Sequence, residues 1–325
     1  MKPRILVIRG GAIGDFVLTL PAIRLLRENF PGAHLEILGY RHIVALAEGR
    51  LHADAARSIE YAALAQFFAP GAELDPGLVE YFASFQQVVS YLFDPDGFFE
   101  TNVRRCGVKH FLVCPPKLDD SAHAAHQLAR PLQSLALFLE DAGATLHPSA
   151  DDRAFADDFL SGIPQPLLAL HPGSGSAKKN WALENWRAIG EWLMDFRFPA
   201  GGENPTLLVL GGEADSANLA ALENAWLHNP RVRFAKNLPL PHAAALLARC
   251  ALFLGHDSGV SHIAAAAGAP CLLLFGPTDP QIWAPANPHV RVLRAPDKTM
   301  NGIGIGDVQR GVAEIAGRKQ TNPVH

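Results

Sequence analysis

The stretch Ala251-Leu-Phe-Leu-Gly-His-Asp-Ser-Gly-Val-Ser-His-Ile-Ala-Ala-Ala-Ala-Gly-Ala-Pro-Cys-Leu-Leu-Leu-Phe275 decides the fold class. Its two apolar runs, residues 251–254 and 271–275, predict strands. The small residues at 259–267 between them predict a helix. A strand, a helix and a second strand in succession are typical of a parallel sheet covered by helices. A sheet buried on both faces also explains why the strand residues do not alternate with polar ones.

The same alternation continues along the chain and predicts two doubly wound α/β domains, residues 1–150 and 151–325. Residues 144–166, rich in Pro and Asp, are interpreted as the linker, with a short helix at 155–160, and the last helix is free to pack back on the first domain. The helices between residues 41 and 85 have no clear borders. Further strands are expected at 4–8, 35–38, 88–93, 111–114, 167–170, 207–210, 232–234 and 290–293. Further helices are expected at 15–29, 123–142, 184–196, 215–227, 242–249 and 307–315.

The composition excludes several classes of protein. Hydrophobic residues make up 49% of the 325 residues and charged residues 18%, which excludes intrinsic disorder. A net charge of −4 argues against a nucleic-acid partner. The N-terminal apolar run is too short for a secretory signal, and the run at 263–275 is too short to cross a bilayer. We therefore expect a cytoplasmic protein, with peripheral membrane contact left open. Its four cysteines are expected to be free thiols, because none forms a Cys-x-x-Cys pair.

Ligands of doubly wound sheets bind at the carboxyl ends of the strands, so the loops after the strands are the candidate sites. The first such loop, residues 9–15, has glycines at positions 10, 11 and 14. This spacing does not fit a dinucleotide-binding motif. Asp15 begins the following helix. It is either a first-turn acid that stabilises the helix or a base that takes a proton from a hydroxyl.

The loops after two strands of the second half carry charged residues. Residues 171–181 combine Gly and Ser with Lys178 and Lys179, which suits a diphosphate. The alternative is a solvated loop with surface lysines, and Trp181 is expected to pack rather than stack on a ligand. In residues 210–215, Glu213 suits a ribose diol, whereas Asp215 is expected to cap the next helix.

The loop at residues 255–262 is the most informative. Asp257 or Ser258 caps a helix whose N-terminus favours a phosphate group. His262 lies on the same helix face as Ser258, either facing the ligand or as a buried, hydrogen-bonded histidine. His123 and His126 are three residues apart and are interpreted as surface residues, acceptor contacts or metal ligands. We expect no metal site, because no third ligand is near them in sequence.

Together these motifs resemble glycosyltransferase family 9, the ADP-heptose:lipopolysaccharide heptosyltransferases. The resemblance covers residues 4–285 and rests on residues 5–9 with Gly14, Asp15 and 18–22, and on 171–174, 179–181, 211–213 and 257–262. It implies a GT-B fold, in which two Rossmann-like domains face each other across a cleft. It also implies an inverting, metal-independent enzyme without a cofactor. Such an enzyme moves a sugar, heptose in the family, from an ADP-sugar to lipopolysaccharide core or another glycan hydroxyl.

The resemblance assigns roles to individual residues. Asp15 becomes the catalytic base. Gly14 and His123 are predicted, apart from the resemblance, as possible acceptor contacts. The donor nucleotide falls on Ser174, Lys179, Glu213, Asp257, Ser258, Gly259 and His262. The partners implied are a nucleotide-sugar, a glycan or glycolipid acceptor and the inner membrane surface. The acceptor side departs from the family, because six phenylalanines there (67, 68, 82, 85, 98 and 99) form either core or a hydrophobic acceptor site. A GT-B nucleotide-sugar epimerase, a nucleotide-dependent oxidoreductase and a non-catalytic binding module are the alternatives.

Overall fold

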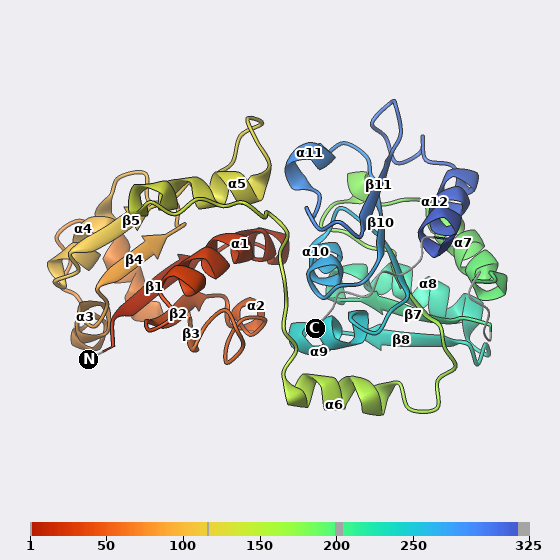
Figure 1. The fold of residues 1–325 in the computed structure, drawn as a ribbon, viewed down its shortest axis with the longest axis horizontal. Helices are drawn as coiled ribbons and strands as arrows, with labels where there is room; N and C mark the ends of the chain where they lie inside the picture. Colours follow the sequence, from red (N-terminus) through yellow and green to blue (C-terminus); the bar gives the residue numbers. More distant parts are fainter. Residues whose placement is uncertain (1, 116, 199–203, 318–325) are drawn as a thin grey trace. The chain divides into compact units, whose positions relative to one another are not determined.

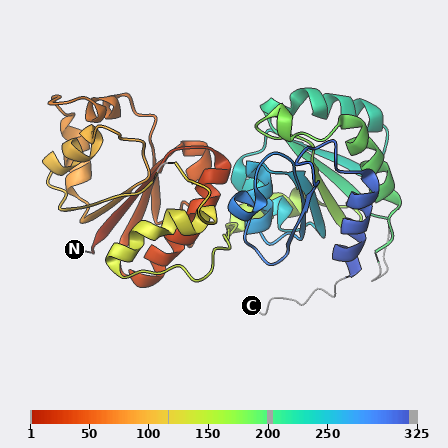
Figure 2. The same cartoon turned by 90° about the horizontal axis from the view of Figure 1, so that it is seen from above.

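The computed structural model describes residues 2–115, 117–198 and 204–317. The chain divides between His147 and Pro148 into two compact units, which we call unit 1 and unit 2. Each unit is a parallel sheet with helices on both faces (Figures 1 and 2). The α/β class predicted from the alternation of strands and helices is therefore confirmed.

Unit 1 contains a five-stranded sheet in the order β3-β2-β1-β4-β5. All neighbouring strands are parallel, and β1 pairs with β2 in a register that places Ile8 opposite Leu38. Strand β3 was not predicted, because its short sequence carries no long apolar run. The strands are β1 (Arg4–Arg9), β2 (His34–Gly39), β3 (Ala55–Ser58), β4 (Gln87–Ser90) and β5 (His110–Val113).

The helices of unit 1 cover both faces of this sheet, with α1 packed on α5 and α4 packed on the 3-10 helix η1. Phe67, Phe82, Phe85 and Phe99 lie in the buried core beneath η1, α3 and α4. Of the six phenylalanines, these four therefore do not form an acceptor surface, whereas Phe68 is exposed. The helices are α1 (Ile13–Asn29), α2 (Arg41–Val44), η1 (Ala62–Phe68), α3 (Pro76–Ala83), α4 (Phe98–Arg105), α5 (Ala124–Ala129) and the 3-10 helix η2 (Arg130–Leu135).

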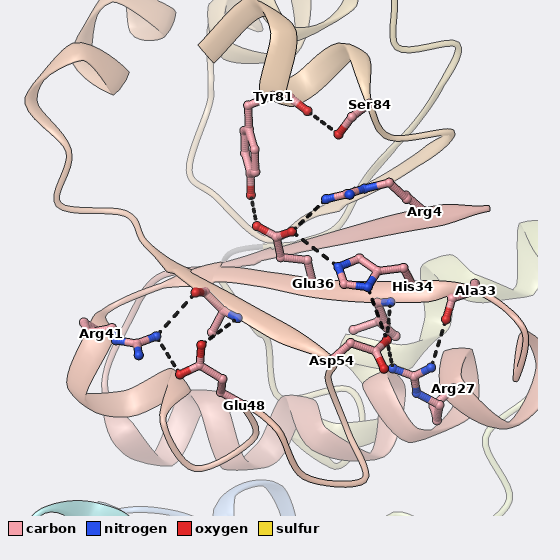
Figure 3. A network of polar contacts seen from close by, with 12 residues as sticks. Arg4, Arg27, Ala33, His34, Glu36, Arg41, Glu48, Asp54, Tyr81 and Ser84 are labelled. Carbon is pink, nitrogen blue, oxygen red and sulfur yellow. Dashed lines mark hydrogen bonds and ion pairs between the residues drawn. The ribbon is translucent and has the colours of Figure 1, made fainter. Parts of the chain in front are cut away.

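A buried carboxylate joins β1, β2 and α3 in unit 1 (Figure 3). Glu36 lies in the middle of β2, and it accepts hydrogen bonds from Arg4 Nη2 at 3.0 Å and from the Tyr81 hydroxyl at 2.8 Å. A buried charge is tolerated only when it is paired and hydrogen-bonded. The Glu36 contacts meet that condition, so this network holds α3 on the sheet.

The long helix predicted at residues 123–142 is wrong. Helix α5 ends at Ala129, η2 follows to Leu135, and Ala136 has a left-handed backbone with φ 58°. Pro131 explains the break, because proline has no N–H for the helical hydrogen bond and its ring clashes with the preceding turn. The predicted linker also contains more structure than expected, since α6 (Ala150–Phe159) begins at the Ser149 cap.

Unit 2 contains a six-stranded parallel sheet in the order β11-β10-β9-β6-β7-β8. Helices α7, α8 and α12 contribute Trp186, Leu222 and Val312 to its core. The strands are β6 (Leu167–His171), β7 (Thr206–Gly211), β8 (Val232–Lys236), β9 (Leu252–His256), β10 (Cys271–Phe275) and β11 (Val290–Arg294). The remaining helices are the 3-10 helices η3 (Ala177–Lys179) and η4 (Glu213–Asp215), α7 (Leu183–Asp195), α8 (Ser216–Trp226), α9 (Leu240–Leu247), α10 (Gly259–Ala266), α11 (Pro280–Trp283) and α12 (Ile305–Gly317).

The described part of the last helix, α12, packs on α7, β10 and β11 of its own unit. It does so because Val308 and Val312 are fully buried in the core of unit 2. All four cysteines are buried free thiols, as predicted. Among the residues that the structure describes, no helix has the length and apolar character needed to cross a membrane.

Candidate functional site

Asp15 both caps its own helix and keeps an exposed carboxylate. It is the third residue of α1, and its Oδ2 accepts a hydrogen bond from the Ala12 N–H at 3.0 Å. Its side chain remains 39% exposed. Gly11 makes this turn possible through a left-handed backbone, with φ 97°. The two roles predicted for Asp15, helix stabilisation and proton acceptance, are therefore compatible.

The buried guanidinium of Arg9 lies beside Asp15. Arg9 Nε donates to Thr19 Oγ1 at 3.0 Å, and Nη2 lies 3.8 Å from Asp15 Oδ1. Burial lowers the pKa of Arg9, while the nearby Asp15 charge raises it. Thr19 Oγ1 in turn donates to the Asp15 carbonyl at 2.7 Å. The contacts of Arg9 and Thr19 thus hold the first turn of α1 in position. The signal in the sequence was Arg9 itself, an arginine at the end of an otherwise apolar strand.

A pocket of about 460 Å³ lies beside the carboxyl ends of β2 and β3 in unit 1. Apolar and aromatic side chains form part of its lining, and charged residues lie at Arg57, Glu60 and Asp75. Tyr61 is largely exposed there, and the Arg57 guanidinium lies 4.1 Å from the centre of the Tyr81 ring. An aromatic surface with charged groups around it suits a polar ligand that has apolar faces, such as a sugar.

In unit 2, Lys179 and the N-terminus of α10 lie together. Lys179 Nζ is 2.9 Å from Asp257 Oδ2, and Thr278 Oγ1 donates to the same oxygen at 2.8 Å. Ser258, rather than Asp257, caps α10, because its Oγ accepts from the Ser261 N–H. The Asp257 carboxylate instead forms an ion pair with Lys179. The result is a lysine, paired with Asp257, next to the start of a helix, and backbone N–H groups at a helix start favour an anion.

A chain of hydrogen bonds connects the loops after β6, β7 and β9, which are neighbouring strands. His171 Nε2 lies 3.2 Å from Asp215 Oδ2, and His171 Nδ1 lies 3.3 Å from Ser258 Oγ. Since a carboxylate only accepts, His171 Nε2 carries a hydrogen. Burial raises the pKa of Asp215, but hydrogen bonds from His171 and the Gly212 N–H outweigh that effect and lower it. Asp215 was expected to be a cap only.

His256 forms a second link between these loops. The Trp181 N–H donates to His256 Nε2 at 2.8 Å, so His256 Nδ1 carries the hydrogen that is given to Gly173 O at 3.1 Å. Burial lowers the pKa of His256 to about 4, against smaller opposing effects that include the Gly173 hydrogen bond. A neutral His256 thus fixes the path of the loop that carries Lys179.

The remaining residues predicted for the site differ in how exposed they are and in their hydrogen-bond partners. Glu213 is exposed at the start of η4, and Ser174 Oγ lies 2.6 Å from Asn180 Oδ1. His262 is buried in α10 and only 5% exposed. His123 caps α5, since its Nδ1 accepts from the Ala125 N–H. Trp181 packs in the core, as expected, and its Nε1 donates to Ile303 O.

Sequence reasoning did not assign a role to His171, His256, Thr278 or Arg9. The signal for the two histidines was present, because each is a polar residue at the end of an apolar strand. Within the described parts of the chain, no group of three or more His, Cys, Asp or Glu side chains is placed to hold a metal ion.

Residues 118–310 match the family model Glycosyltransferase family 9 (heptosyltransferase). The chain belongs to glycosyltransferase family 9. It is 25% identical to lipopolysaccharide heptosyltransferase 1 of Escherichia coli O18:K1:H7, over 96% of this chain and 98% of that protein. It is 30% identical to lipopolysaccharide heptosyltransferase 2 of Salmonella typhimurium, but that alignment covers only 42% of this chain and 38% of the relative.

The solved structure of the Escherichia coli ADP-heptose heptosyltransferase II is similar to this family 9 chain. The alignment covers 96% of this chain and 98% of the chain in that structure. The TM-score is 0.74 at 18% identity. This likeness confirms the GT-B fold class.

We expect unit 2 of this family 9 protein to lose stability in acid. The unfolded chain protonates His256 near its ordinary pKa of 6.5, whereas the folded protein does so only near pH 4. The stabilisation is therefore complete above pH 6.5 and is lost as the pH falls toward 4, by up to about 3 kcal/mol. Urea unfolding at several pH values measures this slope. A His256→Gln variant should flatten it, whereas an exposed control, His228→Gln, should leave it unchanged. Equal slopes in all three proteins would contradict the role of His256.

Proposed function

We propose that the chain transfers heptose from ADP-heptose to a hydroxyl of the lipopolysaccharide core, with inversion at the anomeric carbon and without a metal ion. Membership of glycosyltransferase family 9 and the similarity to lipopolysaccharide heptosyltransferases support the reaction class. The observation that carries the proposal is the cluster in unit 2, where Lys179 lies beside the N-terminus of α10. That cluster suits the leaving diphosphate of an ADP-sugar.

The donor binds in unit 2 through groups that favour negative charge. When the bond from the sugar to ADP breaks, charge grows on the diphosphate. Lys179 and the N–H groups of Ser258 and Gly259 stabilise that charge in place of a divalent cation. Asp257 holds Lys179 in position, and Thr278 donates a hydrogen bond to the same oxygen of Asp257. Glu213 is exposed, and we assign the ribose hydroxyls to it.

Asp15 acts as the base in unit 1. Its exposed carboxylate takes the proton of the acceptor hydroxyl as that oxygen attacks the anomeric carbon. The new bond forms on the face opposite the departing ADP, which inverts the configuration. The helix hydrogen bond to Ala12 and the Arg9 contact fix the direction of the carboxylate.

The acceptor binds in unit 1. We assign a sugar of the acceptor to the pocket with Tyr61 and Arg57, because its aromatic and charged lining suits a glycan. Gly14 and His123 remain proposed acceptor contacts. Since the acceptor is a glycolipid, the proposal includes peripheral contact with the cytoplasmic face of the membrane.

A transfer assay tests the reaction. The chain is incubated with ADP-heptose and a lipopolysaccharide core that lacks heptose, with EDTA present. We expect a product heavier by one heptose, one ADP released for each transfer, and inverted anomeric configuration by NMR. A thermal-shift panel with ADP, UDP, GDP and NAD should show stabilisation by ADP alone. Epimerisation of a UDP-sugar, or stabilisation by NAD instead of ADP, would overturn the proposal.

We expect a Lys179→Met variant to bind ADP about 10- to 100-fold more weakly, because it loses a charge-assisted hydrogen bond to the diphosphate. The matched control is Lys178→Met, which removes the same charge from an exposed neighbour in the same loop. Isothermal titration calorimetry measures both dissociation constants. Equal losses in the two variants would indicate a nonspecific effect of charge and contradict the role of Lys179.

A further inference from the structure

Two hydrogen bonds link Asp215 to His171 and His171 to Ser258 in unit 2. His171 is buried, its Nε2–H donates to Asp215, and its Nδ1 lies 3.3 Å from Ser258 Oγ. While the imidazole is neutral, Nδ1 has only a lone pair. The Ser258 hydroxyl must then donate its hydrogen to His171, or a buried acceptor is left unsatisfied.

When His171 is neutral, the hydrogen of the Ser258 hydroxyl therefore points to His171 and is not available to an anion. Ser258 Oγ also accepts a hydrogen bond from the Ser261 N–H. The hydroxyl then presents only a lone pair to a phosphate, which is unfavourable. Ser261 Oγ lies 3.1 Å from Ser258 Oγ, but it cannot supply a hydrogen because its own O–H donates to His256 O.

Protonation of His171 reverses this arrangement. The imidazolium donates from Nε2 to Asp215 and from Nδ1 to Ser258 Oγ. Ser258 Oγ then accepts two hydrogen bonds, from His171 and from the Ser261 N–H. Its own hydrogen is released to donate to a phosphate oxygen, which completes the hydrogen-bonding capacity of the hydroxyl.

We propose that binding of a diphosphate at Ser258 is coupled to the uptake of one proton by His171, which is thereby a positioning residue for the Ser258 hydroxyl. The proton comes from the acid form of the buffer, whose bond to it breaks and leaves the buffer base, and an N–H bond forms at His171 Nδ1. No other covalent bond changes. This inference rests on the proposed function, because it concerns the diphosphate of the same donor.

The charges around His171 favour the coupling. Asp215 faces it from η4, and the charge of Asp257 in the β9–α10 loop is offset by Lys179. His256 packs nearby and has its pKa lowered by burial to about 4, so it is neutral where imidazoles ordinarily titrate. An arriving diphosphate adds negative charge, which stabilises the imidazolium.

Calorimetry with ADP-ribose tests the proposal, because the diester diphosphate of this ligand has no titrating group near neutral pH. Titrations in buffers of different ionisation enthalpy give the number of protons taken up. We expect net uptake of up to one proton per ligand. We also expect the dissociation constant to rise by up to about tenfold per pH unit over the pH range in which protons are taken up.

Variants assign the proton to its site. His171→Gln should bind without proton uptake and with a flat pH profile. Ser258→Ala should lower the uptake to less than half, and it leaves the imidazole in place if His171→Gln fails to fold. The control, His228→Gln, removes an exposed histidine of unit 2 and should match the wild-type protein.

The outcomes separate this inference from the proposed function. Binding of ADP-ribose without proton uptake would overturn the coupling and leave the donor assignment standing. Unchanged uptake in His171→Gln or in Ser258→Ala would also overturn it, because the proton would then belong to another group. If neither ADP nor ADP-ribose binds, the proposed function and the coupling both fall.

Discussion

Asp15→Asn should lower the turnover of heptose transfer by about 100- to 10,000-fold, which is the usual contribution of a positioned general base. The substitution keeps the size of the side chain and an oxygen that can still accept from the Ala12 N–H. It removes only the ability to take a proton and the negative charge. We therefore expect little change in the ADP dissociation constant, because the nucleotide is assigned to unit 2. Steady-state kinetics and calorimetry measure the two quantities.

The matched control is Glu28→Gln, which makes the same chemical change at an exposed position near the other end of α1. It should retain full turnover. The thermal midpoint of Asp15→Asn should fall only slightly, since loss of a first-turn charge costs about 0.3–1 kcal/mol. Turnover within threefold of wild type in Asp15→Asn would rule out the base assignment and leave Asp15 as a helix-stabilising residue.

Gly173→Ala should destabilise unit 2 by about 1–3 kcal/mol or more, because the buried Asp215 carboxylate would lose its hydrogen bonds. A Cβ at this position would overlap Oδ1 and Cγ of the Asp215 side chain. The Asp215 carboxylate would have to leave the place where it holds His171 and the Gly212 N–H. Urea unfolding measures the loss of stability, and ADP binding should weaken with it because Ser258 loses its support.

Gly175→Ala is the control in the same loop, because a Cβ there meets nothing within 4 Å. It should be within about 0.5 kcal/mol of wild type, as is usual for surface substitutions. The double variant Gly173→Ala/Asp215→Ala removes the clash and should recover part of the stability, though not the ADP affinity. A single Gly173→Ala variant as stable as Gly175→Ala would show that Asp215 does not depend on this close approach.

Parts of the site could be predicted because their signals are local. An apolar run followed by small or polar residues marks the end of a strand. Parallel strands end at one edge of a sheet, so the loops that carry Asp15, Lys179 and Ser258 were expected to hold ligands. Ser258 as a cap was one of two readings, because Asp257 and Ser258 are both suitable residues. Only the geometry showed that Asp257 is engaged by Lys179 and Thr278.

The errors also have local causes. The helix expected to extend to residue 142 ends early because Pro131 interrupts an otherwise favourable pattern. Strand β3 was not predicted because its own sequence does not indicate a strand. Its pairing with β2 stabilises it instead. The phenylalanines at 67, 82, 85 and 99 were ambiguous because a core and a hydrophobic surface use the same residue types.

The sequence by itself determined the α/β class, the order of most strands and helices, and the loops in which the chemistry lies, because hydrophobic periodicity and turn residues act over a few neighbouring positions. Only the tertiary structure decided which of these loops touch. His171, Asp215 and Ser258 are separated by more than forty residues at each step, and they meet because β6 lies between β9 and β7 in the sheet. Strand order depends on the packing of whole helices and strands, which no short stretch of sequence encodes.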